Sequence, residues 1–214
     1  MPTKSVNRVV RTQSVLAVCG SLLLSACAAK YAQVPPRLDL APYGRVALVT
    51  FSADRDAQPG MDALATQRFA EALLASQPGV ELFELERTDS TVRRIPAADA
   101  PALAKALGRE KDVPAVFVGE LKVSGVKPRG KVSTASLHMR ATVSAELTVR
   151  LISTRTGGTL WRSSSAAEGT VGRLALTRGL PAVAMRDQDE AYGEVVQQLV
   201  AGVTRDLRPT WVKQ

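Results

Sequence analysis

The sequence MRATVSAELTVRL, residues 139–151, is the stretch that decides the fold. Its odd-numbered positions are all apolar, whereas its even-numbered positions are all polar or charged. Strict alternation of this kind predicts a β-strand with one face toward a core and one toward water, extending about 44 Å if straight. The turn residues Thr156, Gly157 and Gly158 follow it, so residues 159–167 are predicted to return as the antiparallel partner.

The rest of the chain reads as short strands that alternate with amphipathic helices. Apolar runs bounded by Pro-Gly pairs predict buried strands, and apolar positions spaced by three and four predict helices. The predicted strands are 45–51, 80–85 and 113–123, and the predicted helices are 61–75, 98–107 and 192–207. This order indicates an α/β fold: a single two-layer or three-layer-like domain, with a mixed β-sheet, a long antiparallel hairpin and covering helices.

The N-terminal residues look like an export signal rather than part of the fold. Lys4, Arg8 and Arg11 precede an apolar run over 15–24, and no acidic residue is present in this segment. A basic region, a short apolar region and small residues at a cleavage site are typical of a secretory signal peptide.

The residues Leu24, Ser25, Ala26 and Cys27 resemble the lipobox of bacterial lipoproteins, in which a peptidase cuts before the cysteine and the cysteine carries the lipid. An ordinary signal peptide with a chance cysteine and a short transmembrane anchor are the alternatives, although an anchor needs about 20 apolar residues. In the lipoprotein family, Asp at the position after the lipidated cysteine retains a protein at the inner membrane. Ala28 occupies that position here, so the resemblance implies the outer membrane.

The chain is therefore predicted to have three parts. Residues 1–26 form the lipoprotein signal peptide, residues 27–44 form the lipidated cysteine with an extended, proline-bearing tether, and residues 45–214 form the periplasmic α/β domain.

Charge and cysteine content restrict the partners. The signal removes three basic residues and no acidic one, so the formal charge falls from +8 to +5. A modest basic excess in an exported protein predicts no nucleic-acid partner, whereas anionic lipid headgroups and peptidoglycan are nearby. Cys19 and Cys27 both lie at or before the cleavage site, so the domain has neither a disulfide nor a thiol nucleophile.

No residue pattern indicates catalysis. His138 is the single histidine, no Gly-x-Ser-x-Gly elbow accompanies it, and a zinc site would need more ligands. Asp54, Asp56 and Asp62 cluster after the first predicted strand, where a solvated loop and a helix N-terminus also explain acidic residues. Phosphate-binding glycine motifs are missing from the sequence. The sequence thus predicts a non-enzymatic protein without metal or cofactor.

Two features are candidate partner contacts. Lys127, Arg129 and Lys131 form a basic cluster that the sequence places at the tip of a β-turn, either as a solvated turn or as a contact for an anionic partner. Trp161 is expected to pack inside the domain. Trp211, just beyond the last predicted helix, is expected either to pack or to face a partner.

The chain resembles the curli-secretion lipoprotein superfamily in three stretches: RVALVTF at 45–51, VPAVFVGELKV at 113–123 and VRLISTRTGGTLW at 149–161. This superfamily includes CsgG-type secretion lipoproteins, LpoB-type activators of peptidoglycan synthases and the N-terminal domain of TolB. Thr156, Gly157 and Trp161 match its turn pattern, but Ser153 stands where an acidic residue is expected.

The resemblance implies membrane β-hairpins at residues 124–138 and 169–184 if the chain is a secretion pore. Here these segments are short and basic, and a basic residue facing lipid costs about 2–4 kcal/mol at the bilayer midplane. The leading hypothesis is therefore an outer-membrane lipoprotein, held by lipid at Cys27, that binds an envelope protein in assembly or secretion. The alternatives are a homo-oligomeric secretion channel and an envelope hydrolase acting through Asp54 and Asp56.

Overall fold

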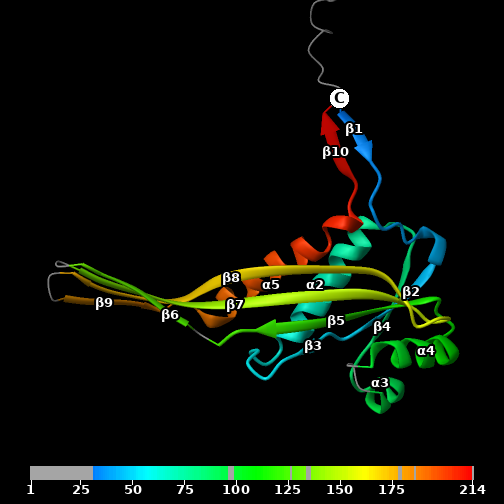
Figure 1. The fold of residues 1–214 in the computed structure, drawn as a ribbon, viewed down its shortest axis with the longest axis horizontal. Helices are drawn as coiled ribbons and strands as arrows, with labels where there is room; N and C mark the ends of the chain where they lie inside the picture. Colours follow the sequence, from blue (N-terminus) through cyan, green and yellow to red (C-terminus); the bar gives the residue numbers. More distant parts are fainter. Residues whose placement is uncertain are drawn as a thin grey trace, which may run out of the picture. The chain divides into compact units, whose positions relative to one another are not determined.

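The alternating stretch lies inside strand β7 (Ser136–Ser153), which pairs along its length with β8 (Thr159–Thr177) in an antiparallel hairpin. The structure is a computed structural model. It describes residues 31–95, 99–125, 127–133, 136–177, 180–185 and 187–213, with the backbone alone for residues 31, 128–133, 136–140, 171–177, 180–185, 188 and 213. Figure 1 shows the hairpin running through the main sheet.

The main sheet is mixed, with the strand order β4-β2-β5-β7-β8-β9. Its central strand β2 (Arg45–Val49) pairs in parallel with β4 (Glu81–Leu85) and β5 (Ala115–Val123), and the short β3 (Ser52–Ala53) also pairs with β5. Strand β5 pairs antiparallel with β7. The predicted α/β class, with early parallel pairing and a late antiparallel hairpin, is confirmed.

Helices cover both faces of the sheet, which makes this part of the fold three-layered. On one face, α2 (Met61–Ser76) and α5 (Gln188–Val203) pack on alternate residues such as Leu48 and Phe117. On the other face, α4 (Ala100–Lys111) lies beside the short α3 (Ser90–Arg94). It packs on the strand residues whose side chains point to that face, such as Val49 and Val116. Figure 1 shows α3 and α4 beside each other, apart from α2 and α5.

Aspartates begin three of the four α-helices in the described residues. Asp89 accepts from the Thr91 amide, Asp99 from the Ala102 amide and Asp187 from the Asp189 amide. Each carboxylate satisfies a backbone donor that has no partner within its helix. Helix α2 instead follows Gly60, whose φ of 88° suits glycine, and carries Asp62 in its first turn.

An aromatic chain fills the core between the sheet and α2. The ring centroids of Phe51 and Phe69 lie 5.4 Å apart, those of Phe69 and Phe117 5.3 Å, and those of Phe117 and Trp161 6.1 Å. Edge-to-face and tilted arrangements at these distances are favourable for aromatic pairs. Trp161 packs inside the domain, as the sequence predicts.

The packed part of the chain begins earlier than residue 45. Leu40 is fully buried, next to the short helix η2 (Ala41–Tyr43), and its amide donates to Gln77 Oε1 at 3.0 Å. Gln77 Nε2 donates to the carbonyls of Leu38 at 3.1 Å and Leu207 at 2.7 Å. The predicted extended tether therefore does not hold for residues 38–43, because a buried glutamine at the end of α2 binds this segment to the domain.

A separate two-stranded ribbon forms from the two ends of the described chain. Strand β1 (Tyr31–Val34) pairs antiparallel with β10 (Thr210–Lys213). It belongs to a different compact unit from Pro35–Pro209. Within that larger unit, α5 ends at Val203 rather than at 207, and the short helix η3 (Arg205–Leu207) follows it.

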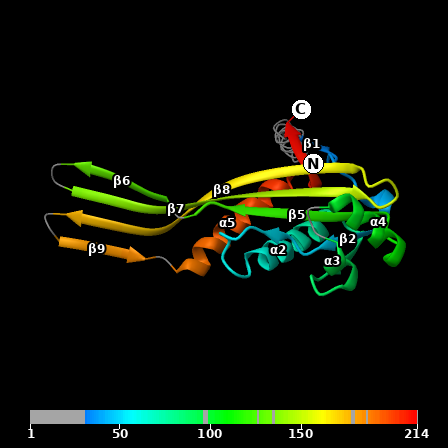
Figure 2. The same cartoon turned by 60° about the horizontal axis from the view of Figure 1, so that its bottom comes forward.

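The sheet also continues past its helices as a four-stranded extension, which includes the two segments where the resemblance implies hairpins. It consists of β6 (Lys127–Ser133), residues 136–142 of β7, residues 170–177 of β8, and β9 (Leu180–Met185). Figures 1 and 2 show these strands extending beyond α5.

Candidate functional site

The lipidation sequence lies outside the described residues. Leu24, Ser25, Ala26 and Cys27 all precede Tyr31, where the description begins. The predicted signal peptide, cleavage site and lipid attachment therefore remain predictions from the sequence.

The basic cluster at 127–131 is not a turn. Lys127, Arg129 and Lys131 lie in β6, which pairs antiparallel with the first part of β7. The prediction of a turn tip was wrong because Pro128 and Gly130 were taken as turn residues. Proline is tolerated in an edge strand, and β6 has a described partner on one side only.

Register in the extension brings basic residues of three strands together. Arg129 stands opposite Arg140, and Arg140 stands opposite Arg173, so three arginines form one cross-strand row. Lys131 stands opposite His138, and this pair is two residues from the Arg129–Arg140 pair on the same face of β6 and β7. No acidic residue occurs in the sequence over 127–142 or 169–185. Like charges directly opposite each other destabilise a sheet, so this row favours an anionic contact.

The cross-strand rows that lie between the basic rows of the extension are apolar. Because successive residues of a strand alternate between its faces, these rows belong to the face opposite the arginines. The first row is Val132, Leu137, Leu176 and Pro181, and the second is Gly130, Met139, Leu174 and Val183. The extension is thus an amphipathic sheet with one basic and one apolar face.

The aspartates proposed for hydrolysis have structural contacts. Asp54 Oδ2 accepts from the Val123 amide at 2.9 Å, and the Asp54 amide donates to the Leu121 carbonyl at 3.1 Å, so the residue joins the loop after β3 to the end of β5. Asp62 forms an ion pair with Arg87. Asp56 is exposed. Among the described residues, no group of three His, Cys, Asp or Glu side chains could hold a metal ion.

His138 and Trp211 belong to different compact units. His138 lies within β7, and its side chain is outside the description. Trp211 is 64% exposed in strand β10. In the described part of the chain, no helix is both long and apolar enough to cross a membrane.

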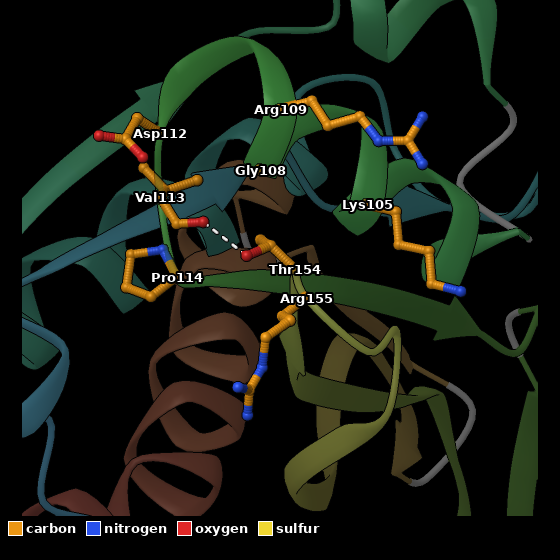
Figure 3. Close-up of a pocket in the computed structure, with 8 residues that line it drawn as sticks. All are labelled: Lys105, Gly108, Arg109, Asp112, Val113, Pro114, Thr154 and Arg155. Atoms are coloured by element: carbon orange, nitrogen blue, oxygen red, sulfur yellow. Dashed lines mark hydrogen bonds between the residues drawn. The ribbon is translucent and has the colours of Figure 1, made fainter.

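A cavity that the sequence did not reveal lies between the C-terminal half of α4 and the turn after β7. We call it the α4–turn cavity. Its volume is about 490 Å³, and its lining residues are Lys105, Gly108, Arg109, Asp112, Val113, Pro114, Thr154 and Arg155. Figure 3 shows Lys105 and Arg109 extending to the same side of α4, Arg155 extending from the turn in a different direction, and Asp112 pointing away from Lys105 and Arg109.

The walls of this cavity are held together by close contacts. Thr154 Oγ1 donates to the Val113 carbonyl at 2.6 Å, and the Thr154 amide donates to the Pro114 carbonyl at 3.0 Å. Gly108 faces Thr154 so closely that a Cβ on residue 108 would lie 2.4 Å from Thr154 Cβ. Helix α4 and the turn therefore keep a fixed spacing.

A network of ion pairs lies elsewhere on α4, toward α3. Lys111 Nζ lies 3.2 Å from Asp89 and 3.3 Å from Glu110, and Arg94 lies 3.6 Å from Glu110. A hydrogen bond from the Thr91 amide, together with Lys111, lowers the pKa of Asp89. The hydroxyl of Thr91 and the charge of Lys111 lower the pKa of Glu110, and the two carboxylates raise the pKa of Lys111.

The sequence indicates only part of the α4–turn cavity. Lys105 lies in the predicted helix 98–107, but Arg109 lies beyond its predicted end, so the sequence did not place these two cations on one helix. Arg155 directly precedes the predicted turn residues, and nothing local in the sequence connects it with α4.

Comparisons with known proteins give similar structures but no family. No family model matches the chain, and no curated protein matches it. The PelC dodecamer from Paraburkholderia phytofirmans is 17% identical, with a TM-score of 0.44, over 84% of this chain and 97% of that chain. Lipoprotein GNA1162 from Neisseria meningitidis is 19% identical, with a TM-score of 0.39, over 59% and 83%.

The LpoB C-terminal domain from Salmonella enterica is 14% identical, with a TM-score of 0.35, over 69% of this chain and 90% of that chain. The similar structures therefore include bacterial lipoproteins, and LpoB is one of the groups named by the sequence resemblance. At these identities and scores the comparisons assign no family to the chain.

Proposed function

We propose that this chain is an outer-membrane lipoprotein whose periplasmic domain binds another envelope protein without catalysing a reaction. Lipid on Cys27 holds it at the membrane, and the Leu24–Cys27 sequence supports this attachment. The four-stranded extension supplies the binding surface. This proposal keeps the predicted contact residues Lys127, Arg129 and Lys131 but moves them from a turn to a sheet face.

The observation that carries the proposal is the arginine row at positions 129, 140 and 173. The register places these residues opposite one another on three neighbouring strands, although they are far apart in the sequence. Like charges directly opposite one another destabilise a sheet modestly, and an anionic group bound to the row would relieve this repulsion. Acidic side chains of a partner protein would do so through charge-assisted hydrogen bonds.

A charge-reversal experiment tests the binding surface. The variant K127E/R129E/K131E should lose the partner that is crosslinked to the wild-type chain in intact cells. The matched control is R55E/R162E/R205E, which changes three exposed arginines outside the extension. We expect the control to retain the crosslinked partner. Equal crosslinking by both variants would contradict the proposed surface.

A photocrosslinker gives an independent measurement of position. Placed at residue 129, it should capture a discrete envelope protein, whereas at residue 162, on β8 outside the extension, it should capture little. Capture from 162 but not from 129 would move the binding surface to the body of the sheet.

A homo-oligomeric secretion channel is the second candidate, and one observation favours it. Segments 124–138 and 169–184 do contain paired strands, and the register places the basic residues of the described strands on one face: Lys127, Arg129, Lys131 and Arg173. The predicted cost of basic residues in lipid would not apply if the apolar face alone met the bilayer. However, β6 has 7 residues and β9 has 6, whereas a membrane-crossing strand needs about 9–11.

The oligomeric state in detergent separates these two functions. Heat-resistant rings would favour the channel, whereas a monomer that still crosslinks to a different envelope protein would favour the binding component.

A further inference from the structure

Three cationic side chains border the α4–turn cavity without a described counterion. Lys105, Arg109 and Arg155 are all exposed. The salt bridges of the described residues include none of them, although neighbouring Arg94 and Lys111 are both paired. Arg94 of α3 and Lys111 of α4 are thus neutralised, whereas the three cations at the cavity have no ion pair among the described residues.

The acidic lining residue does not supply the missing charge. Asp112 ends α4 in a left-handed conformation with φ of 51°, and Figure 3 shows its carboxylate directed away from Lys105 and Arg109. Its charge acts on Arg45 instead. A hydrogen bond and charge from Glu81 raise the pKa of Arg45, and Asp112 adds to this effect.

Helix electrostatics explain only one of the three cations. Arg109 lies in the last turn of α4, where a positive charge is stabilised by the helix dipole. Lys105 lies too far from the C-terminus for that effect, which is limited to the last turn. Arg155 belongs to a different element.

The backbone holds the two sides of the cavity in place before any ligand binds. Besides the Gly108–Thr154 contact, Gly157 has a φ of 76°, and a Cβ there would lie 2.9 Å from Lys105 Cε. The stem of Lys105 therefore crosses directly over the turn that carries Arg155. Such preorganisation reduces the ordering cost of binding.

We propose that the α4–turn cavity binds the phosphate group of an anionic ligand. Guanidinium and ammonium groups form strong charge-assisted hydrogen bonds with phosphate oxygens, and three cations match a doubly charged group. The volume of about 490 Å³ is within the range of small-molecule sites, so it accommodates a phosphate with the organic group attached to it. The ligand is a soluble phosphate ester or a phospholipid headgroup, which share this chemistry.

The test measures binding of inorganic phosphate to the purified full chain by NMR at constant ionic strength. The amides of Gly157 and Gly158 should shift in a saturable way. The variant K105Q/R155Q should weaken the apparent affinity by about tenfold or more, because each lost cation removes a charge-assisted contact. The control R162Q changes an exposed arginine outside the cavity and should leave the affinity within about twofold of the wild type.

Failure to saturate, or an equal response in K105Q/R155Q and the wild type, would overturn the proposal. An amide spectrum of the variant that matches the wild type away from the cavity confirms that the variant folds. Binding to vesicles of phosphatidylglycerol, compared with vesicles of phosphatidylcholine, shows whether the bound phosphate group belongs to a lipid headgroup or to a soluble ester. Loss of phosphatidylglycerol binding together with phosphate binding indicates a lipid headgroup, whereas loss of phosphate binding alone indicates a soluble ester. Vesicle binding without any saturable phosphate response overturns the site.

Discussion

Gly108 in α4 packs directly against Thr154, the residue that follows β7, and a Cβ on residue 108 would lie 2.4 Å from Thr154 Cβ. This contact joins the helix on one face of the sheet to the turn of the long hairpin. It also sets the width of the α4–turn cavity, which both residues line.

The variant Gly108→Ala should therefore destabilise the protein, although alanine is the better helix former. We expect the free energy of unfolding to fall by about 1–3 kcal/mol, because an extra methyl group has no space against Thr154. Urea unfolding measures the change. The control is Gly193→Ala in α5, where nothing lies within 4 Å of the added Cβ. It should stabilise the protein by about 0.5–1 kcal/mol. Equal effects of the two substitutions would contradict the packing argument.

Replacing Gln77 should release the segment before β2. Gln77→Met keeps a similar volume but leaves the Leu40 amide and the carbonyls of Leu38 and Leu207 without their partner. We expect a loss of about 2–4 kcal/mol, since each buried unpaired group costs about 1–3 kcal/mol. Hydrogen exchange at the Leu40 amide should accelerate. Unchanged protection of Leu40 would show that residues 38–43 do not depend on this contact.

The α3–α4 ion pairs should make stability depend on pH in acid. The pKa values of Asp89 and Glu110 are lowered in the folded state, so their contribution is present above their unfolded values, about 3.9 and 4.3, and is lost as the pH falls through the folded values. The variant D89N/E110Q should therefore lose less stability than the wild type between pH 7 and pH 3. Urea midpoints at the two pH values measure this. Parallel losses in both proteins would contradict it.

The contribution of Lys111 to stability depends on pH in the opposite direction. Its pKa is raised, so its contribution is complete below its unfolded value of about 10.4 and is lost as the pH rises through the folded value. Lys111→Met should flatten the stability profile above pH 10 while lowering stability at neutral pH. A profile above pH 10 as steep as that of the wild type would show that other groups titrate there.

These contacts also show how far the sequence could predict the fold. The alternation at 139–151 and the apolar spacing in 61–75 identified the hairpin and α2, because both patterns are local and each element buries one face. Strand β6 was missed because Pro128 and Gly130 resemble turn residues when their partner strand is unknown. The α4–turn cavity was missed because its lining residues, such as Lys105 and Arg155, are fifty positions apart in the sequence and come together only through the packing of α4 on the turn.

The arginine row leads to a prediction in which stability and binding change in opposite directions. Arg140 stands between Arg129 and Arg173, so Arg140→Thr removes both like-charge pairs and introduces a residue that favours strands. The variant should be more stable by about 0.2–1 kcal/mol at low salt, and the gain should shrink in concentrated salt, which screens repulsion. Its crosslinking to the envelope partner should weaken. A loss of stability at low salt would contradict the repulsion inferred from the register.

The proposed attachment to the membrane depends on a different residue, Cys27, which lies outside the described residues. The variant Cys27→Ser should not incorporate labelled fatty acid and should accumulate as the uncleaved precursor, because serine lacks the thiol that carries the lipid and the lipobox requires a cysteine after the cleavage site. Ser25→Thr is the control, since it leaves the cysteine in place. Gel mobility and fatty-acid labelling of both variants measure the outcome. Normal processing and outer-membrane fractionation of Cys27→Ser would show that residues 24–27 are not a lipidation site, and the binding domain would then require another means of reaching the membrane.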